Sequence, residues 1–265
     1  METLAIASCW LPDLPWSNLF ALGPMVLPRL LPVLSLTLAF ALAAWGMRAV
    51  TFSGALAGFV VTALICLAAG LPAFFTVFTV FVLTFIATRL GYGRKQRLGA
   101  AEHHEGRRAS QVYANLGVAA LCAAPLIFVS GIRGLALGIT AALAEAAADT
   151  VSSELGQAFN NRPLLLTTLQ PVQPGTNGAI SLVGTLTGIT SAAIVAGVAI
   201  WTGLIYPHWF WLVVIGATLG MFFDSLLGAT VEEPGGLNND SVNFISSAFT
   251  AFFVLLTWLL TQIHS

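Results

Sequence analysis

The chain has 265 residues and a formal net charge of −1, and 57% of its residues are hydrophobic while only 8% are charged. Ordinary soluble domains carry about 25% charged residues, so this chain cannot cover a globular surface with polar groups and is predicted to lie in lipid. With about 20 apolar residues per transmembrane helix, it can cross a bilayer roughly six to nine times. The near-neutral charge gives no indication of nucleic-acid binding.

Taken in chain order, the apolar segments predict an all-α polytopic membrane protein of about eight transmembrane helices, in which residues 1–265 form a single integral membrane domain. The segments are 27–45, 54–69, 72–90, 112–129, 135–148, 179–204, 209–230 and 242–263. Three polar stretches, 91–111, 152–178 and 231–241, separate some of them. No cleavable signal peptide is evident, because the first residues lack a basic region.

The basic residues give an orientation. Most of them fall on one side of the eight-helix arrangement: Arg48, Arg89, Arg94, Lys95, Arg97, Arg107, Arg108 and Arg162. Only Arg29 and Arg133 fall on or near the other side. The positive-inside rule makes the first side cytoplasmic, with both termini outside. The three polar stretches follow odd-numbered crossings and therefore share the cytoplasmic face, which suits an enzyme that draws a soluble cosubstrate from the cytosol. Trp201, Tyr206, Trp209 and Trp211 surround one short loop, as expected of an interfacial belt.

The segment AEAAADTVSSELG, 144–156, is the richest in reactive groups. On a helix, Glu145, Asp149 and Ser152 or Ser153 lie three or four residues apart and share one face. Acids inside a membrane segment cost at least a few kcal/mol each, so they need partners or a function. Magnesium accepts carboxylates together with phosphate oxygens and is favoured here. The alternative is pairing with basic residues of the 91–111 stretch.

Two further polar elements follow. QPGTNGAISLVG, 173–184, leads into an apolar helix and suits an anion held by free backbone N–H groups at a helix N-terminus. Gly184, Gly188 and Gly197 beyond it are read first as helix-packing residues. Asp224 is another intramembrane acid, for which the burial cost favours function. LNNDSVN, 237–243, offers oxygen ligands at the last helix, where Asp240 or Ser241 would also serve as an N-cap.

The remaining candidates are weaker. The basic stretch 94–108 is a phosphate-binding surface or a topogenic loop that faces anionic lipid. Zinc binding by His103 and His104 is not favoured, because adjacent histidines point apart on a helix. Three cysteines, Cys9, Cys66 and Cys122, are read as small packing residues. The sequence contains no GxxxxGK[ST], GxSxG or HExxH motif.

Together, ADTVSSELG (148–156), PGTNGAISLVGTLTG (174–188), FDSLLGA (223–229) and LNNDSVN (237–243) resemble the motif set of one integral-membrane family. It contains the eukaryotic transmembrane-protein-nineteen group and the plant chloroplast phytyl-phosphate kinase of tocopherol synthesis. A basic GRR-xxxxxxN element is also present as Gly106, Arg107, Arg108 and Asn115, and the likeness covers about residues 85–250. SLVGTLTG (181–188) is distantly similar to an element of dolichol-kinase-type CTP-dependent enzymes, but Val183 stands where those enzymes carry a glutamate.

The resemblance implies a phosphotransferase that uses a nucleoside triphosphate, with CTP the first candidate, to convert an isoprenyl monophosphate into its diphosphate. Asp149, Asp224 and Asp240 would be the catalytic acids and, with Glu145, would hold Mg²⁺. Residues assigned to substrate and nucleotide are Arg94, Lys95, Arg107, Arg108, Asn115, Ser153, Glu154, Gly175, Thr176, Asn177, Gly178, Ser181, Asn238 and Asn239. Two alternatives stay open: cytidylyl transfer to a lipid phosphate, and an ion or lipid transporter that uses the intramembrane acids. The partners expected are the lipid substrate, the nucleotide and membrane lipids, while the lipid chain length, the donor and any homo-oligomer are left open.

Overall fold

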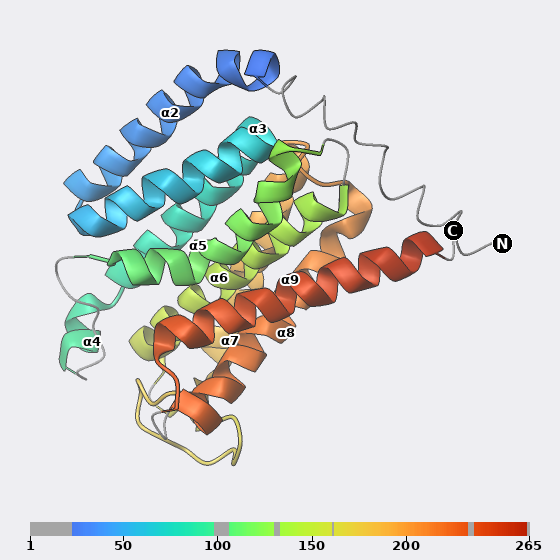
Figure 1. Ribbon diagram of the computed structural model, residues 1–265. Helices are drawn as coiled ribbons and strands as arrows, with labels where there is room; N and C mark the ends of the chain where they lie inside the picture. Colours follow the sequence, from blue (N-terminus) through green and yellow to red (C-terminus); the bar gives the residue numbers. More distant parts are fainter. Residues whose placement is uncertain (1–22, 98–105, 130–132, 161, 233–235, 264–265) are drawn as a thin grey trace.

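The computed structural model describes residues 23–97, 106–129, 133–160, 162–232 and 236–263 (Figure 1). Its α-helices are α2 (Gly23–Gly46), α3 (Phe52–Arg89), α4 (Tyr92–Arg97), α5 (Ala109–Ala123), α6 (Arg133–Phe159), α7 (Leu182–Trp201), α8 (Phe210–Leu227) and α9 (Asn239–Ile263). Short turns are the 3-10 helices η2 (Ala124–Ile127) and η3 (Pro207–Trp209) and the π-helical η4 (Gly228–Glu232). Two strands of two residues each, β1 (Leu164–Leu165) and β2 (Ala179–Ile180), pair antiparallel.

The predicted all-α polytopic fold is confirmed. Within the described ranges, six helical stretches are long and apolar enough to cross a membrane, and α2 adds a shorter apolar stretch, Leu30–Gly46. One of the six, α3, has 38 residues, about 57 Å at 1.5 Å per residue, which exceeds the thickness of a bilayer core. This helix therefore cannot be a single straight crossing.

α3 is a helical hairpin bent at Gly70. This glycine has φ 76° and ψ −168°, a backbone conformation that is nearly exclusive to glycine, and Pro72 follows it. The Arg89 guanidinium at the end of α3 donates to the Met47 carbonyl just before its start, at 2.7 Å, so the two arms run antiparallel. The predicted separate crossings at 54–69 and 72–90 are therefore confirmed as the two arms of α3.

α6 is the central helix of the bundle. It packs against α3, α5, α7, α8 and α9 (Figure 1). In its apolar window 83% of the residues are buried, against 28–39% in the other five spans. Its many alanines allow such close contact with neighbouring helices. The core of the bundle is therefore organised around α6.

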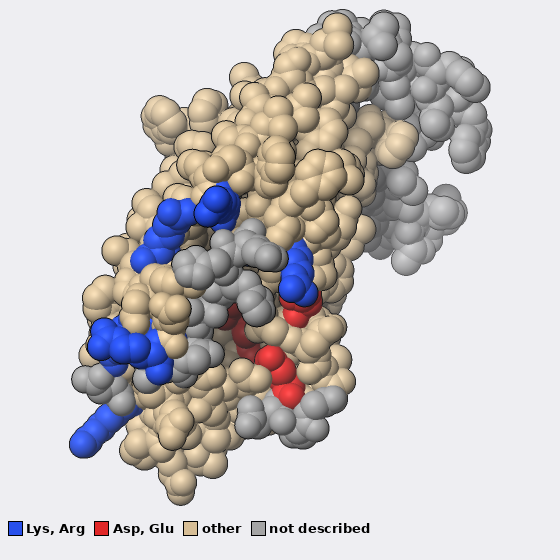
Figure 2. Space-filling model, turned by 90° about the vertical axis from the view of Figure 1, so that its left-hand side faces the viewer, with Lys and Arg blue, Asp and Glu red and all other residues tan. Residues whose placement is uncertain are grey.

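The polar stretches meet at one end of the bundle. Val50 pairs with Arg107 in a parallel β-bridge, and the Arg94 guanidinium donates to the Asn160 carbonyl at 3.0 Å, so the ends of α3, α5 and α6 lie together. Figure 2 views this end and shows basic side chains spread across it, with acidic side chains emerging between them. At the opposite end, Arg133 lies over the Tyr206 ring at 5.4 Å, and Trp201 at the end of α7 is exposed. The shared face of the three polar stretches is therefore seen in the fold, and its cytoplasmic orientation stays a prediction.

Candidate active site at the polar end of the bundle

The acids of α6 point toward α8 and α9. Glu145 is 1% exposed, and the Ser247 hydroxyl of α9 donates to its Oε2 atom. Its Oε1 atom has no hydrogen-bond partner among the described residues. The sequence left open that a basic residue of the 91–111 stretch pairs with Glu145. Among the described residues, no such ion pair is present. Glu145 is therefore a buried polar group with one oxygen still available.

Asp224 of α8 lies next to Asp149, one turn of α6 beyond Glu145. The Ser246 hydroxyl donates to Asp224 Oδ2 at 3.0 Å, and the Asn243 amide nitrogen, when it faces this carboxyl, does so at 3.2 Å. Two neighbouring carboxylates repel each other unless a cation or a shared proton compensates their charge. Asp149 and Asp224 therefore form a site at the polar end that favours a bound cation or a shared proton.

The glycine-rich loop, PGTNG at residues 174–178, covers Asp149 and Asp224 and leaves a cavity of about 150 Å³. Gly178 makes the closure possible: its φ is 74°, and a Cβ atom there would lie 2.4 Å from that of Ala229 and 2.5 Å from the Ser225 carbonyl oxygen. This glycine therefore allows the loop to pack closely against the end of α8, and its assignment to the nucleotide stays a prediction. Gly175, with φ 94°, remains exposed on the cavity side.

The structure brings together most of the acids and loop residues that the sequence singled out. The predicted residues that line the cavity are Asp149, Ser153, Gly175, Thr176, Asn177, Gly178, Ser181, Asp224 and Asn239. Ser152, which the sequence placed on the face of Asp149, also lines it, and three further polar residues that line it were not predicted: Gln157, Ser225 and Glu232. Glu232 ends the π-helical η4, a type of turn that is frequent at functional sites.

Two predicted residues at the start of α9 have other positions. Asn238 is the N-cap, because its Oδ1 atom accepts from the Ser241 N–H at 2.9 Å. The prediction that Asp240 or Ser241 caps the helix is thus corrected. Asp240 follows in the first turn and does not line the cavity, so the structure does not group it with Asp149 and Asp224.

Lys95 and Glu154 are engaged with each other. They form an ion pair between α4 and α6, with the lysine 1% exposed and the glutamate 7% exposed. Lys95 also donates to the carbonyls of Ala87 and Thr88, at 3.2 and 2.7 Å, so its three hydrogens have acceptors. The structure therefore gives both residues structural partners, where the sequence assigned them to substrate binding.

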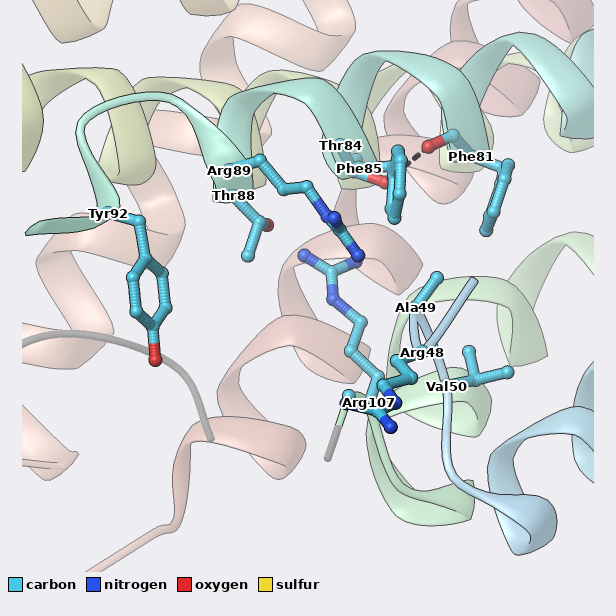
Figure 3. A pocket seen from close by; sticks show the side chains of 11 residues that line it. Arg48, Ala49, Val50, Phe81, Thr84, Phe85, Thr88, Arg89, Tyr92 and Arg107 are labelled. Atoms are coloured by element: carbon cyan, nitrogen blue, oxygen red, sulfur yellow. Dashed lines mark hydrogen bonds between the residues drawn. The ribbon is translucent and has the colours of Figure 1, made fainter. Parts of the chain in front are cut away.

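The GRR element supplies one side of a second, basic pocket. Gly106 has φ 83°, and a Cβ atom there would lie 2.6 Å from the Ala49 carbonyl carbon, so only glycine allows this close approach. The Arg107 N–H then donates to the Ala49 carbonyl at 3.0 Å, and its side chain enters a pocket of about 390 Å³ (Figure 3). Arg108 instead is exposed and precedes α5 in a capping box with Gln111. Arg107 is near enough to Asp149 for the two charges to interact.

Sequence reasoning missed three residues of this basic pocket: Arg48, Arg89 and Tyr92. In the sequence, Arg48 and Arg89 indicated only the orientation of the chain in the membrane. Nothing in the spacing of these residues indicated a shared site, because they meet only through the hairpin of α3.

Of the four acids predicted to hold Mg²⁺, only Asp149 and Asp224 line the same cavity. Within the described part of the chain, no group of three or more His, Cys, Asp or Glu residues is placed to hold a metal ion. Mg²⁺ commonly takes one or two protein carboxylates and completes its shell with water and substrate phosphates, a demand that Asp149 and Asp224 meet. Glu145 and Asp240 do not line the cavity that contains this pair. His103, His104 and Cys9 fall outside the described residues, and Cys66 and Cys122 are free thiols, as expected.

Comparison with known proteins agrees with the motif resemblance. The profile of the family described as "Integral membrane protein DUF92" matches residues 35–251, which include α3 to α8 and the second half of α2. The chain is 32% identical to protein VTE6, chloroplastic, of Arabidopsis thaliana over 77% of its length, and this match spans 64% of VTE6.

Two further relatives extend the range of organisms. An uncharacterized membrane protein of Synechocystis, sll0875, is 33% identical over 68% of this chain and 71% of its own length. Protein PGR of Arabidopsis thaliana is 27% identical over 82% of this chain and 90% of its own. No solved structure gives a significant match. The chain therefore belongs to the DUF92 integral membrane family, the family of the transmembrane-protein-nineteen and plant phytyl-phosphate kinase type.

Proposed function

We propose that this protein is a membrane-embedded isoprenyl-phosphate kinase. One observation carries the proposal: Asp149 and Asp224 lie side by side in a polar cavity that is covered by the PGTNG loop and is next to Arg107. Phosphoryl transfer needs mainly positioning and neutralisation of phosphate charge, and this arrangement offers carboxylates for a metal cation and a positively charged guanidinium for phosphate oxygens. The motif resemblance to the phytyl-phosphate kinase supplies the substrate class.

In the proposed reaction, an oxygen of the lipid monophosphate attacks the γ-phosphorus of the nucleoside triphosphate. A new P–O bond forms there, and the bond from the γ-phosphorus to the β–γ bridging oxygen breaks, which leaves the nucleoside diphosphate and the lipid diphosphate. The attacking group is already anionic, so the reaction requires no strong base. Mg²⁺ held by Asp149 and Asp224 would neutralise charge on the nucleotide phosphates. Arg107 would orient and neutralise the phosphates on the opposite side.

A labelling experiment tests the reaction. Purified full-length protein is supplied with Mg²⁺, geranylgeranyl or phytyl monophosphate, and CTP labelled at either the γ- or the α-phosphorus. The kinase proposal predicts that only the γ-label enters the lipid, as a diphosphate. Entry of the α-label instead identifies cytidylyl transfer, the alternative that would use the same acids. Parallel reactions with ATP identify the donor.

The cavity acids provide the matched variants. Asp149→Asn is expected to reduce transfer by about 100-fold or more, because a neutral amide cannot hold the cation that compensates the phosphates. Gln96→Ala, which removes an exposed amide from α4 at the same end of the bundle, is the control and should transfer at the rate of the unsubstituted protein. Absence of lipid labelling with every nucleotide, or full activity of Asp149→Asn, would exclude the proposal. Flux of ions or lipid in proteoliposomes without nucleotide would support the transporter alternative.

A further inference from the structure

An apolar groove adjoins the basic pocket. Both cavities share Val50, Phe81, Thr84 and Arg107 as lining residues, so they are neighbours, and we call the two together the lipid groove. Its basic mouth lies at the polar end of the bundle. Its apolar part lies between α2, the two arms of α3, and α5.

Three arginines define the mouth. Figure 3 shows the side chains of Arg89 and Arg107 directed toward each other across the pocket, with Arg48 close to Arg107. Arg89 is held in place by its hydrogen bond to the Met47 carbonyl and by its position 4.4 Å over the Phe85 ring. Among the described residues that line the mouth, none is acidic. Three guanidinium groups gathered at one mouth are complementary to an anion with several oxygens, such as a phosphate.

The apolar part of the groove suits a hydrocarbon chain. On the first arm of α3 its wall is made of Gly54, Ala55, Gly58 and Thr62, a strip of small residues that runs for about 12 Å at 1.5 Å per residue. A Cβ atom added at Gly58 would meet no other atom within 4 Å, so this glycine faces open space in the groove. Phe40 and Phe81 contribute the opposite wall, with ring centroids 5.1 Å apart.

We propose that the lipid groove binds a single-chain lipid phosphate, with the phosphate between Arg48, Arg89 and Arg107 and the isoprenyl chain along the small-residue strip of α3. The identity of the lipid rests on the proposed kinase function, whereas the place of binding rests on the groove. Arg107 lines the groove and also interacts with Asp149, so a phosphate in the mouth lies beside the acids that would hold the nucleotide. The groove and the loop-covered cavity would thus hold the acceptor and the donor on opposite sides of Arg107.

A binding measurement without nucleotide tests the site. The full-length protein, in phosphatidylcholine nanodiscs, is photolabelled with a geranylgeranyl monophosphate that carries a diazirine in its chain, and the labelled peptides are mapped. Labels are expected on α2, α3 and α5, and unlabelled geranylgeranyl monophosphate should compete for them. Competition of equal strength by geranylgeraniol, by phosphatidic acid or by Mg²⁺–CTP would overturn the proposal, and so would labelling confined to α7 or α8.

Two kinds of variant separate the phosphate from the chain. Arg48→Gln and Arg89→Gln should each lower the affinity for the probe by about 10-fold, the effect of one lost charge-assisted contact of about 1.4 kcal/mol. Gly58→Leu should lower it as well, because the added side chain occupies the groove. Gly197→Leu is the matched control, because a Cβ atom there also meets nothing within 4 Å but lies on α7, away from the groove.

The outcomes distinguish this inference from the kinase proposal. Mapped labelling of the groove in a protein that transfers no phosphate would retain the binding site and reject the kinase. Transfer activity with unchanged affinity in Arg48→Gln, Arg89→Gln and Gly58→Leu would retain the kinase and reject the groove.

Discussion

At the scale of single residues, the buried ion pair of Lys95 and Glu154 decides how α4 is attached to the bundle. The lysine side chain reaches from a short exposed helix to a glutamate on α6 and is almost fully enclosed. Enclosing one charge without its partner costs far more than the pair contributes in net stability. Replacing one member of the pair should therefore destabilise the protein more than replacing both.

Lys95→Met and Glu154→Gln should each lower the free energy of unfolding by about 3–5 kcal/mol, because each leaves one buried charge uncompensated. The double variant Lys95→Met/Glu154→Gln should recover a large part of that loss. Unfolding of the purified protein in detergent, followed by tryptophan fluorescence in a double-mutant cycle, measures the coupling. Additive or negligible effects would mean that the pair is not formed and would return both residues to the substrate-binding role expected from the sequence.

Three residues that the sequence did not single out, Ser246, Ser247 and Thr250, lie near the acids on the same face of α9 as Asn243, which belongs to the predicted 237–243 element. Asn243, Ser246, Ser247 and Thr250 of α9 are spaced by three, four and seven residues, so they lie on one helix face. Two of their hydroxyls donate to Glu145 and Asp224. The spacing was a usable signal, but serine and threonine are also common packing residues in membrane helices, so the pattern gained meaning only once the acids were placed opposite it.

At the scale of elements, the contact of α6 with α7 positions Asp149 beneath the glycine-rich loop. Gly184 and Gly188 lie against α6: a Cβ atom on Gly184 would be 2.6 Å from the Ser152 carbonyl oxygen, and one on Gly188 would be 2.9 Å from that of Ala148. The interpretation of these two glycines as packing residues is confirmed. Gly197 has open space around it and has no such role.

Gly184→Ala is therefore expected to lower the free energy of unfolding by about 1–3 kcal/mol, because the added methyl group meets backbone that cannot move aside. It should also reduce phosphoryl transfer, since separation of the two helices displaces Asp149 from the loop. Gly197→Ala is the control and should be neutral, or more stable by up to about 1 kcal/mol from its better helix propensity. Equal stability of the two variants would show that α6 and α7 do not approach this closely.

The elements themselves were largely predictable, because long apolar segments in a chain of this composition have few alternatives to helices. The fifth apolar segment, expected at 135–148, is the middle of α6, Arg133–Phe159, and the same helix contains the segment 144–156, whose acids the sequence placed on one helix face. Polar residues such as Ser152 and Glu154 suggested an end to the membrane segment, yet the helix continues because they lie at the polar end, where Lys95 compensates the glutamate. The short strands β1, within the 152–178 stretch, and β2, just after it, carried no recognisable strand pattern.

At the scale of the whole molecule, the antiparallel course of the helices brings three distant polar stretches to one end. That convergence could be inferred from the sequence, because it depends only on the number of crossings. The basic pocket could not, because Arg48, Arg89 and Arg107 meet through the hairpin at Gly70 and the bridge between Val50 and Arg107. A site assembled by tertiary contacts of this kind has no signature in the spacing of its residues.

Labelling of introduced cysteines tests the arrangement of both ends. In a background without the three native cysteines, Gln96→Cys and Gln170→Cys place exposed thiols on two polar stretches, and His208→Cys places one in the loop at the opposite end. A membrane-impermeant maleimide should label positions 96 and 170 only from the cytoplasmic side and position 208 only from the outside, because the positive-inside rule orients the basic end inward. Labelling of 96 and 170 from opposite sides would contradict the shared face on which the proposed active site depends. Labelling of all three from the reversed sides would keep that face and invert its orientation, so that the nucleotide would have to come from the other compartment.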